Sequence, residues 1–241
     1  TKKSATKKSA TKKSATKKSA TESPFTGFGP RTLKFLKALD ANNNRDWFMA
    51  NKDRYEDEVR EPARAFIRAM EKPLRSISKR LVADDSKVGG SLMRVHRDVR
   101  FRKDKTPYKT NVGIQFRHDV GKDVHAPGLY LHLGLDGCFL GMGMWHPDAD
   151  ALKGIRNHID GKGPKWRKVM AAVESAGWRM SGESLKRAPK GFDPEHADIE
   201  LLRRKDHILI CDLTNKEAAG ADLVDRVMAR AQTAKPHMAL L

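Results

Sequence analysis

Hydrophobic and polar positions divide the chain into three successive regions. Between residues 31 and 81, apolar side chains recur at spacings of three and four, which indicates amphipathic helices. Between residues 92 and 144 they alternate with polar residues or glycine, which indicates half-buried strands. Helical spacing returns between residues 148 and 233, with one β-rich run at 207–213. Helices, then strands, then helices predict the α+β class.

The first region predicts three helices, at about residues 31–41, 45–59 and 62–81. Asn44 is the expected N-cap of the second helix, because its side chain can accept a hydrogen bond from the first turn. Pro62 suits the first position of the third helix, where its missing N–H costs nothing. Pro73 should kink or divide that helix, since it lacks the N–H that an interior position donates.

The second region predicts an antiparallel sheet of at least four strands, at about residues 92–102, 112–117, 129–135 and 138–144. The dipeptide Asp136-Gly137 favours a type I′ hairpin turn between the last two of these strands. Gly141 and Gly143 share one face of the returning strand, which leaves room there for a ligand or another backbone.

The third region predicts helices at about residues 148–160, 164–176 and 217–233, and a short helical turn at 200–204. Asp148 is the expected N-cap of the first of them. Residues 177–198 lack either periodicity and are interpreted as irregular structure. The helices of the three regions are therefore expected to flank the sheet as N-terminal, middle and C-terminal groups.

Positive charge is concentrated in the stretch from Arg94 to Thr110, which holds seven Lys or Arg and two Asp, a formal charge of +5. If residues 92–102 are extended, alternate side chains point to opposite faces. The face expected to pack on a core carries Met93, Val95, Val99 and Phe101. The opposite face carries Arg94, His96, Asp98, Arg100 and Arg102. Residues 103–109 are expected to turn, because Pro107 fixes its own φ and holds Thr106 extended.

Composition adds a tail to this picture. Residues 1–20 are four copies of Thr-Lys-Lys-Ser-Ala, without one large apolar side chain, so they cannot offset the entropy lost on folding. We expect a disordered tail (1–20), a linker (21–30) whose Phe25 and Phe28 dock onto the domain, and a single α+β domain (31–238). The tail resembles the lysine-rich tails of histone-like proteins and should bind nucleic acid weakly. Its lysines are Lys2, Lys3, Lys7, Lys8, Lys12, Lys13, Lys17 and Lys18.

The net charge of +18 includes +8 from the tail, so the remaining chain still carries +10. This balance favours an anionic partner, either nucleic acid or a small phosphorylated ligand. No apolar run approaches the roughly 18 residues of a membrane span, so no membrane partner is expected. Cys138 and Cys211 are too few for a disulfide framework or zinc site and are expected to be buried thiols, which favours a cytoplasmic location. The lysine-rich tail adds the alternative that the protein is associated with the nucleoid.

Candidate chemistry lies mainly in the basic stretch. The anion-binding candidates are Arg94, Arg97, Arg100, Lys105 and Lys109, because guanidinium and ammonium groups bind phosphate or carboxylate. The catalytic candidates are Asp98, Asp104, Tyr108 and His132, which could orient the cations or transfer protons. No nucleotide-binding glycine loop, cofactor motif or metal motif is evident. Three alternatives stay open: a binding module, an enzyme acting on an anionic substrate, and a purely structural charge cluster.

Several motifs together resemble domain-of-unknown-function family 2461, a conserved hypothetical family. They are Asn42-Asn43-Asn44-Arg45-Asp46-Trp47-Phe48, Lys52 with Tyr55, Arg97-Asp98-Val99-Arg100-Phe101 followed by Asp104-Lys105-Thr106-Pro107-Tyr108-Lys109-Thr110, and Pro189-Lys190-Gly191-Phe192. The resemblance extends from about residue 25 to 235 and leaves out the repeats of the tail. It implies no particular reaction, so the function has to be argued from the residues.

Overall fold

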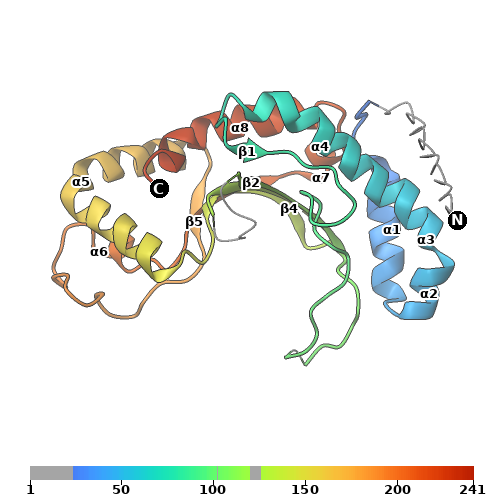
Figure 1. Ribbon diagram of the computed structural model, residues 1–241, viewed down its shortest axis with the longest axis horizontal. Coiled ribbons are helices and arrows are strands. Elements are labelled where there is room, and N and C mark those ends of the chain that lie inside the picture. Colours follow the sequence, from blue (N-terminus) through green and yellow to red (C-terminus); the bar gives the residue numbers. More distant parts are fainter. Residues whose placement is uncertain (1–23, 102, 120–125) are drawn as a thin grey trace, which may run out of the picture.

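The computed structural model describes residues 24–101, 103–119 and 126–241 (Figure 1). In this part of the chain, six strands form one antiparallel sheet in the order β1-β2-β3-β4-β6-β5. The strands are β1 (Leu81–Val82), β2 (Asn111–His118), β3 (Gly128–Gly134), β4 (Gly137–Met144), β5 (Arg179–Ser181) and β6 (His207–Leu213). The α+β class and the antiparallel sheet expected from the sequence are confirmed.

Helices precede, interrupt and follow the strands, as the hydrophobic spacing predicts. They are α1 (Gly29–Ala41), α2 (Arg45–Ala50), α3 (Lys52–Tyr55), α4 (Glu61–Leu74), α5 (Ala149–Ser175), α6 (Ile199–Leu202), α7 (Asn215–Ala219) and α8 (Leu223–Met238), and a π-helical turn, η1 (Glu56–Arg60), joins α3 to α4. Two predicted caps are present: Asn44 accepts from the Trp47 N–H at 2.9 Å, and Asp148 accepts from the Ala151 N–H at 2.8 Å.

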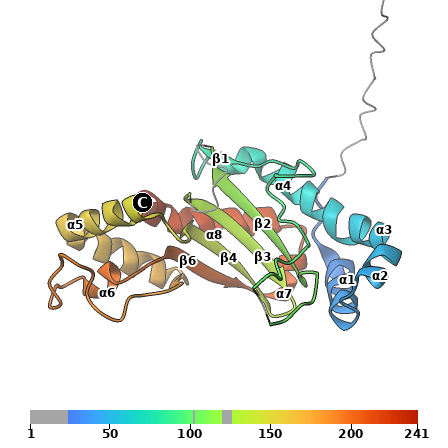
Figure 2. The same cartoon turned by 60° about the horizontal axis from the view of Figure 1, so that its bottom comes forward.

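One face of the sheet is covered and the other is not. Helices α4 and α8 lie across the convex face (Figures 1 and 2), where alternate side chains such as Ile114, Leu131 and Leu140 are fully buried. The intervening side chains, such as Tyr130 and His132, point to the concave face and stay partly exposed. No described helix crosses that concave face (Figure 1), so the polar side chains of the sheet are accessible from it.

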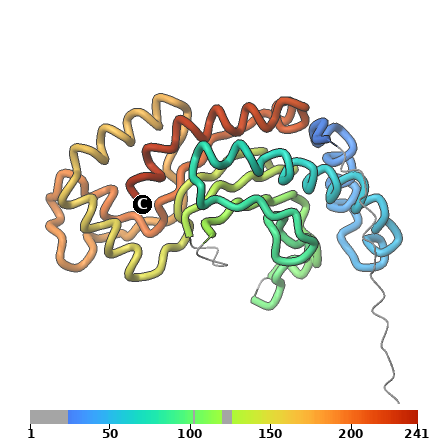
Figure 3. Tube along the Cα trace, turned by 45° about the horizontal axis from the view of Figure 1, so that its top comes forward, coloured from blue at the N-terminus to red at the C-terminus, as the bar shows by residue number. Residues whose placement is uncertain are grey.

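The buried residues form two hydrophobic clusters. The larger one lies between the sheet and α1, α4 and α8, and Phe28, expected to dock from the linker, belongs to it. Phe25 packs on this cluster, with its ring 5.2 Å from that of Phe66. The smaller one comprises Met144, Ile155, Ile159, Trp166, Leu202 and Leu240, beneath α5. Figure 3 shows α5 and the C-terminal part of α8 side by side at this end of the molecule. The division into tail, linker and single domain stays a prediction.

Two helix boundaries differ from those predicted. The helix expected to continue to residue 81 ends at Leu74, directly after Pro73, and Leu81 begins β1 instead. Pro73 leaves one backbone carbonyl without a donor, and the chain then closes a tight turn in which Ser76 N–H donates to the Pro73 carbonyl at 3.0 Å. The helix predicted at 217–233 is divided, because the extended backbone of Gly220 (φ −73°, ψ 151°) ends α7.

The prediction was also wrong at two places in the sheet. Residues 177–198 were interpreted as irregular, yet Arg179–Ser181 form β5 against β6. The β3–β4 turn is one residue earlier than predicted, since Gly134 pairs with Gly137 and the loop is Leu135–Asp136. The only described non-glycine residue with positive φ is His146, so Leu135 and Asp136 do not form a type I′ turn.

The space expected beside the glycines of β4 is taken by neighbouring atoms at Gly143. A Cβ there would lie 2.2 Å from the His207 carbonyl oxygen, so this position admits the close approach of another backbone. At Gly141 a Cβ would meet only side chains, those of Ile208 and Tyr130. Glycine at 143 therefore serves the packing of β4 on β6.

The strand predicted at 92–102 is replaced by an irregular loop, residues 91–110, beside β2. Met93 N–H donates to the Gly113 carbonyl at 2.9 Å, whereas Lys109 N–H donates to the Val95 carbonyl at 2.8 Å. Between these two hydrogen bonds, one residue separates Met93 from Val95, whereas three separate Lys109 from Gly113. The segment before β2 thus has two more residues than the segment it pairs with, and they interrupt the pairing as a bulge does. The turn begins at Arg100, so Phe101 does not reach the core as predicted and is 94% exposed.

Candidate functional site

Asp104 organises the tip of the 91–110 loop, which projects away from the sheet in Figure 1. Its carboxylate accepts hydrogen bonds from the backbone N–H and the hydroxyl of Thr106, at 2.9 and 3.0 Å, and forms an ion pair with Arg97. These contacts, the Thr106 bonds first, hold the pKa of Asp104 below its usual range. Asp104 is therefore a charged centre that ties both arms of the loop together.

Asp98 binds the next cation of the loop. Its two oxygens accept from Nε and Nη2 of Arg100, at 3.0 and 2.7 Å, in the paired geometry that suits a guanidinium. The Arg100 hydrogen bonds hold the pKa of Asp98 well below its usual range. Lys105 in turn donates from Nζ to the Val99 carbonyl at 2.9 Å. Arg97, Arg100 and Lys105 are thus already engaged by acceptors of the loop itself.

Arg94 and Lys109 differ from these three cations. Within the described part of the chain, neither side chain has a hydrogen bond or an ion pair with an acid. Lys109 is partly buried, and its pKa is lowered, first by desolvation and then by the positive charge of Arg94. The fold therefore holds two cations near each other, and Asp98, an acid whose pKa Arg94 helps to lower, is already bound to Arg100.

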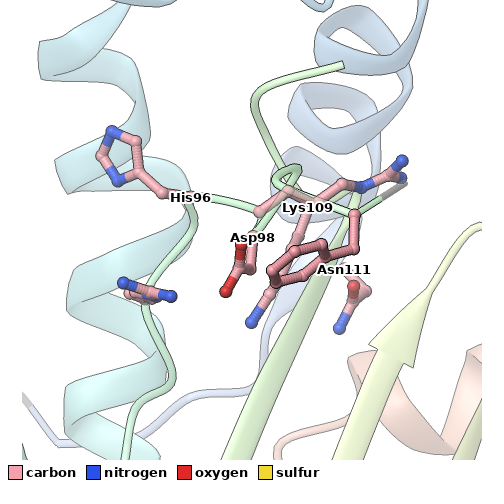
Figure 4. Close-up of a pocket in the computed structure, with 7 residues that line it drawn as sticks. His96, Asp98, Lys109 and Asn111 are labelled. Atoms are coloured by element: carbon pink, nitrogen blue, oxygen red, sulfur yellow. The ribbon is translucent and has the colours of Figure 1, made fainter. Parts of the chain in front are cut away.

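These two cations face a cavity of about 580 Å³ at the base of the loop. Its walls are formed by Arg94, His96, Arg97, Asp98, Phe101, Lys109 and Asn111. Figure 4 shows Asp98, Lys109 and Asn111 together, with the His96 ring turned away from them. That ring lies instead 5.2 Å from the ring of Tyr108. The cavity thus combines cationic, amide and aromatic groups from the loop and the first residue of β2.

Tyr108, a catalytic candidate, does not line this cavity. It is buried, and its ring stacks on that of Phe48 in α2, with centroids 4.1 Å apart and planes 20° apart. Its backbone N–H donates to the side-chain oxygen of Asn43 at 3.0 Å, and its carbonyl accepts from the Asn43 amide at 3.0 Å. Tyr108 therefore attaches the loop to the N-terminal helices.

His132, the other proton-transfer candidate, lies on the concave face of the sheet. Its Nδ1 is 3.2 Å from the Tyr130 hydroxyl, and its Nε2 is 3.3 Å from a carboxylate oxygen of Asp136. Asn111, which lines the cavity, approaches the same Nδ1 at 3.5 Å. The His132 ring stacks on Phe139, with centroids 4.6 Å apart. These contacts place a polar chain at the margin of the cavity.

Small residues make this polar chain possible. A Cβ at Gly134 would lie 2.6 Å from His132 Nε2 and 2.4 Å from the Asp136 carboxylate, so a larger residue there would displace one of these side chains. Burial raises the pKa of Tyr130 to about 12, which keeps the phenol protonated at neutral pH. Sequence reasoning missed Asn111, Asp136 and Phe139. Strand alternation placed Tyr130 and His132 on one face, but only the strand register brings the other three beside them.

The remaining predicted features are less informative. The eight tail lysines and Arg102 lie outside the described residues. Cys138 and Cys211 are buried free thiols, as expected, and burial raises the pKa of Cys138. Among the described residues, no helix is long and apolar enough to cross a membrane. The same residues include no cluster of three or more His, Cys, Asp or Glu side chains arranged to hold a metal ion.

Comparison with known proteins gives one match. A family model described as "Conserved hypothetical protein (DUF2461)" matches residues 31–239. No curated protein and no solved structure matches the chain. The matched range includes the 91–110 loop, Asn111 and the polar chain of His132, and it leaves out the lysine repeats.

Proposed function

The chain belongs to the conserved hypothetical family DUF2461, and we propose that its folded part binds a phosphorylated ligand through Arg94 and Lys109. The basic tail, outside the family match, would add weak affinity for nucleic acid. We place this activity in the cytoplasm, where the free thiols of Cys138 and Cys211 would stay reduced.

The pair Arg94 and Lys109, which makes no ion pair with an acid in the described part of the chain, carries this proposal. Two like charges held close together repel each other, and desolvation of the Lys109 ammonium adds to that cost. A phosphate between them would replace repulsion with charge-assisted hydrogen bonds. The other cations of the loop contribute less, because Asp98 and Asp104 already neutralise Arg100 and Arg97. Asn111 could donate a further hydrogen bond from the floor of the cavity.

Calorimetric titration with inorganic phosphate and with pyrophosphate tests this proposal. Each of Arg94→Ala and Lys109→Ala should weaken binding by about 1.5–3 kcal/mol, or roughly 10- to 150-fold, the usual worth of a hydrogen bond to a charged group. Lys153→Ala is the matched control, since it removes an exposed lysine from α5, at the other end of the molecule. Equal losses in all three variants, or no binding to the wild-type chain, would exclude the cavity as a phosphate site.

The contribution of the tail is tested separately with single-stranded DNA across a salt series. The wild-type chain should lose affinity steeply as salt rises, because its lysines displace counterions from the phosphates. Deleting residues 1–20 should flatten this dependence and leave phosphate binding at the cavity unchanged. If the shortened chain keeps the full salt dependence, nucleic acid is bound by the folded part instead.

A second candidate function is phosphate-ester chemistry, favoured by the chain Asp136–His132–Tyr130 beside the cavity. In this hypothesis Asp136 orients the imidazole, and His132 exchanges a proton with a substrate group held near Asn111. The test is release of nitrophenol from p-nitrophenyl phosphate by the wild-type chain and by His132→Gln. Loss of about 100-fold or more in rate, with phosphate affinity retained, supports catalysis. Absence of turnover by the wild-type chain with this and other phosphate esters excludes it.

A further inference from the structure

Phe101 has a position that the fold does not explain. Its ring is 94% exposed, the most exposed large apolar side chain among the described residues, yet it forms part of the cavity wall. The other aromatic residue of the same loop, Tyr108, is buried against Phe48. An exposed ring gains nothing from folding, so its benefit has to come from a group that binds against it.

Phe101 contacts the charged pair formed by Arg100 and Asp98. The guanidinium of Arg100 lies over the ring, 5.8 Å from its centroid, and Asp98 holds that guanidinium in place with two hydrogen bonds. The same Asp98 lines the cavity. A flat apolar surface is therefore presented beside the cation pair Arg94 and Lys109, in one cavity of about 580 Å³.

We propose that this cavity binds a nucleoside phosphate, with the base stacked on Phe101 and the phosphate held by Arg94 and Lys109. This inference rests on the proposed function and adds the class of ligand. Stacking on an aromatic side chain accepts any base, since every base has a π-face. A cavity of this volume falls in the range of small-molecule sites.

Two further side chains of the cavity wall, Asp98 and Asn111, could bind the sugar of such a ligand. Asp98 keeps a charged carboxylate whose oxygens can accept from a hydroxyl, while its partner Arg100 neutralises the repulsion that a nearby phosphate would meet. Asn111, the first residue of β2, offers both a donor and an acceptor in the same cavity. An anionic membrane surface could also use an exposed ring and cations. The partly buried position of Lys109 inside the cavity favours a ligand that enters it.

The test compares two ligands that differ only in the base. Adenosine 5′-monophosphate and ribose 5-phosphate are titrated into the full chain by calorimetry, with inorganic phosphate as a third probe. The nucleotide should bind about tenfold more tightly than the sugar phosphate. Phe101→Ala should abolish this difference, and Phe101→Trp should keep it. Val88→Ala, which removes an equally exposed apolar side chain outside the cavity, should change neither affinity.

Each other outcome has a defined meaning. Equal affinities for the nucleotide and ribose 5-phosphate overturn the nucleoside assignment and leave the phosphate site standing. Absence of binding by all three probes overturns the proposed function as well. If Phe101→Ala instead weakens binding to phosphatidylserine vesicles and leaves nucleotide affinity unchanged, the ring serves a membrane surface and the inference is wrong.

A single-stranded tetranucleotide tests whether the cavity binds a free nucleotide or a nucleotide within a nucleic-acid strand. Both Phe101→Ala and the wild-type chain carry the same tail, so the ratio of their affinities reports the loop alone. A larger ratio for the tetranucleotide than for adenosine 5′-monophosphate identifies a nucleic-acid strand as the source. The reverse order identifies a free nucleotide. Phe101→Ala and Phe101→Trp should both melt at the wild-type temperature, because Phe101 contributes almost no buried surface.

Discussion

Tyr108 is the residue on which the position of the whole 91–110 loop depends. It is the last apolar side chain before β2, and it is buried between the loop and α2. The backbone on both sides is exposed or partly exposed, so few other contacts fix the loop. The stack on Phe48 and the paired Asn43 hydrogen bonds therefore define where Lys109 and Asn111 lie relative to the sheet.

Tyr108→Ala should lower the free energy of unfolding by about 3 kcal/mol, as expected for removal of a buried aromatic ring. Tyr108→Phe keeps the stack and should cost much less, because no hydrogen bond of the hydroxyl is present among the described residues. Urea denaturation measures both. A large loss in Tyr108→Phe would show that the hydroxyl, rather than the ring, stabilises this position.

At the scale of elements, the loop is held by side chains more than by backbone pairing. The described backbone hydrogen bonds between the loop and β2 end with the one from Met93 to Gly113. Beyond it, two described backbone hydrogen bonds, from Arg97 to Pro107 and from Lys109 to Val95, join the two arms of the loop. Asp104 and its partners Thr106 and Arg97 close the tip. These polar contacts order the tip of the loop, whereas the buried Tyr108 positions Lys109 and Asn111 at its base.

Asp104→Ala should therefore loosen the tip and leave the sheet intact. Trypsin should cleave the variant faster at the basic residues between Arg97 and Lys105, because local opening exposes them to the protease. The melting temperature should change little, since Asp104 is at the surface. Asp136→Ala, which removes an exposed acid from a tight turn of the same sheet, is the control. Unchanged cleavage in Asp104→Ala would mean that the remaining contacts suffice.

Periodicity predicted the elements that have enough residues to display it. Strands β2, β3, β4 and β6 each have seven or eight residues. Burial alternates along the whole of β6, and in the other three the large apolar side chains alternate while glycines between or beside them are also buried. Strand β5 has three residues, too few for a period, and is defined only by its pairing with β6. In the 91–110 loop the alternation of exposure is present from Arg94 to Arg100, but the shifted pairing prevents a regular strand.

The sequence predicted which residues form the basic cluster of the candidate site, but not which of its charges are paired. Clustered basic residues are visible in the sequence, and five of them were identified as anion-binding candidates. The sequence does not show which of them are neutralised, since Asp98 and Asp104 could each bind any of several neighbours. Only the folded loop shows that Arg97 and Arg100 are paired, whereas Arg94 and Lys109 have no ion pair among the residues that the structure describes.

At the scale of the whole molecule, the smaller hydrophobic cluster joins β4, α5, α6 and Leu240, which follows α8. His207 from β6 and His237 from α8 are fully buried beside Trp166, with ring centroids 5.9 and 6.0 Å from it. None of their ring nitrogens has a hydrogen-bond partner in the described part of the chain. Burial lowers the pKa of His207 to about 3 and that of His237 to about 4.

The charges around these rings oppose their protonation further. His237 itself, Arg204 and Arg156 lower the pKa of His207, and Asp206 offsets them only in part. His158 of α5 lies beside Trp166 and donates from Nδ1 to the Leu240 carbonyl, 3.1 Å away. Both rings are therefore neutral in the folded protein at pH values where the unfolded chain already binds protons.

This difference predicts acid destabilisation. Both folded pKa values lie below the unfolded value of about 6.5, so the stability is fully present above pH 6.5 and is lost as the pH falls toward 4. Each histidine should contribute a slope of up to about 1.4 kcal/mol per pH unit in that window. Urea denaturation between pH 7.5 and 4.5 measures it.

A variant separates this effect from titration of carboxylates. His237→Leu removes one imidazole from the cluster and should flatten the pH dependence, whatever it does to stability at pH 7.5. His96→Gln, at an exposed histidine of the loop, should leave the dependence unchanged. An identical slope in wild type and His237→Leu would mean that this histidine is protonated in the folded protein.

The register shift beside β2 has a consequence for how the loop tolerates changes in length. The segment before β2 has two extra residues, an even number, and side chains of an extended chain alternate between two faces. The same face therefore stays buried on both sides of the shift. Tyr108 and Val112 accordingly both face the core, while Lys109 and Asn111 both line the cavity. One inserted or deleted residue here would exchange the two sets, turning aromatic surface outward and burying an ammonium group. Length changes at this point should therefore be acceptable in pairs and damaging singly, a parity rule that sequences of other family members can show directly.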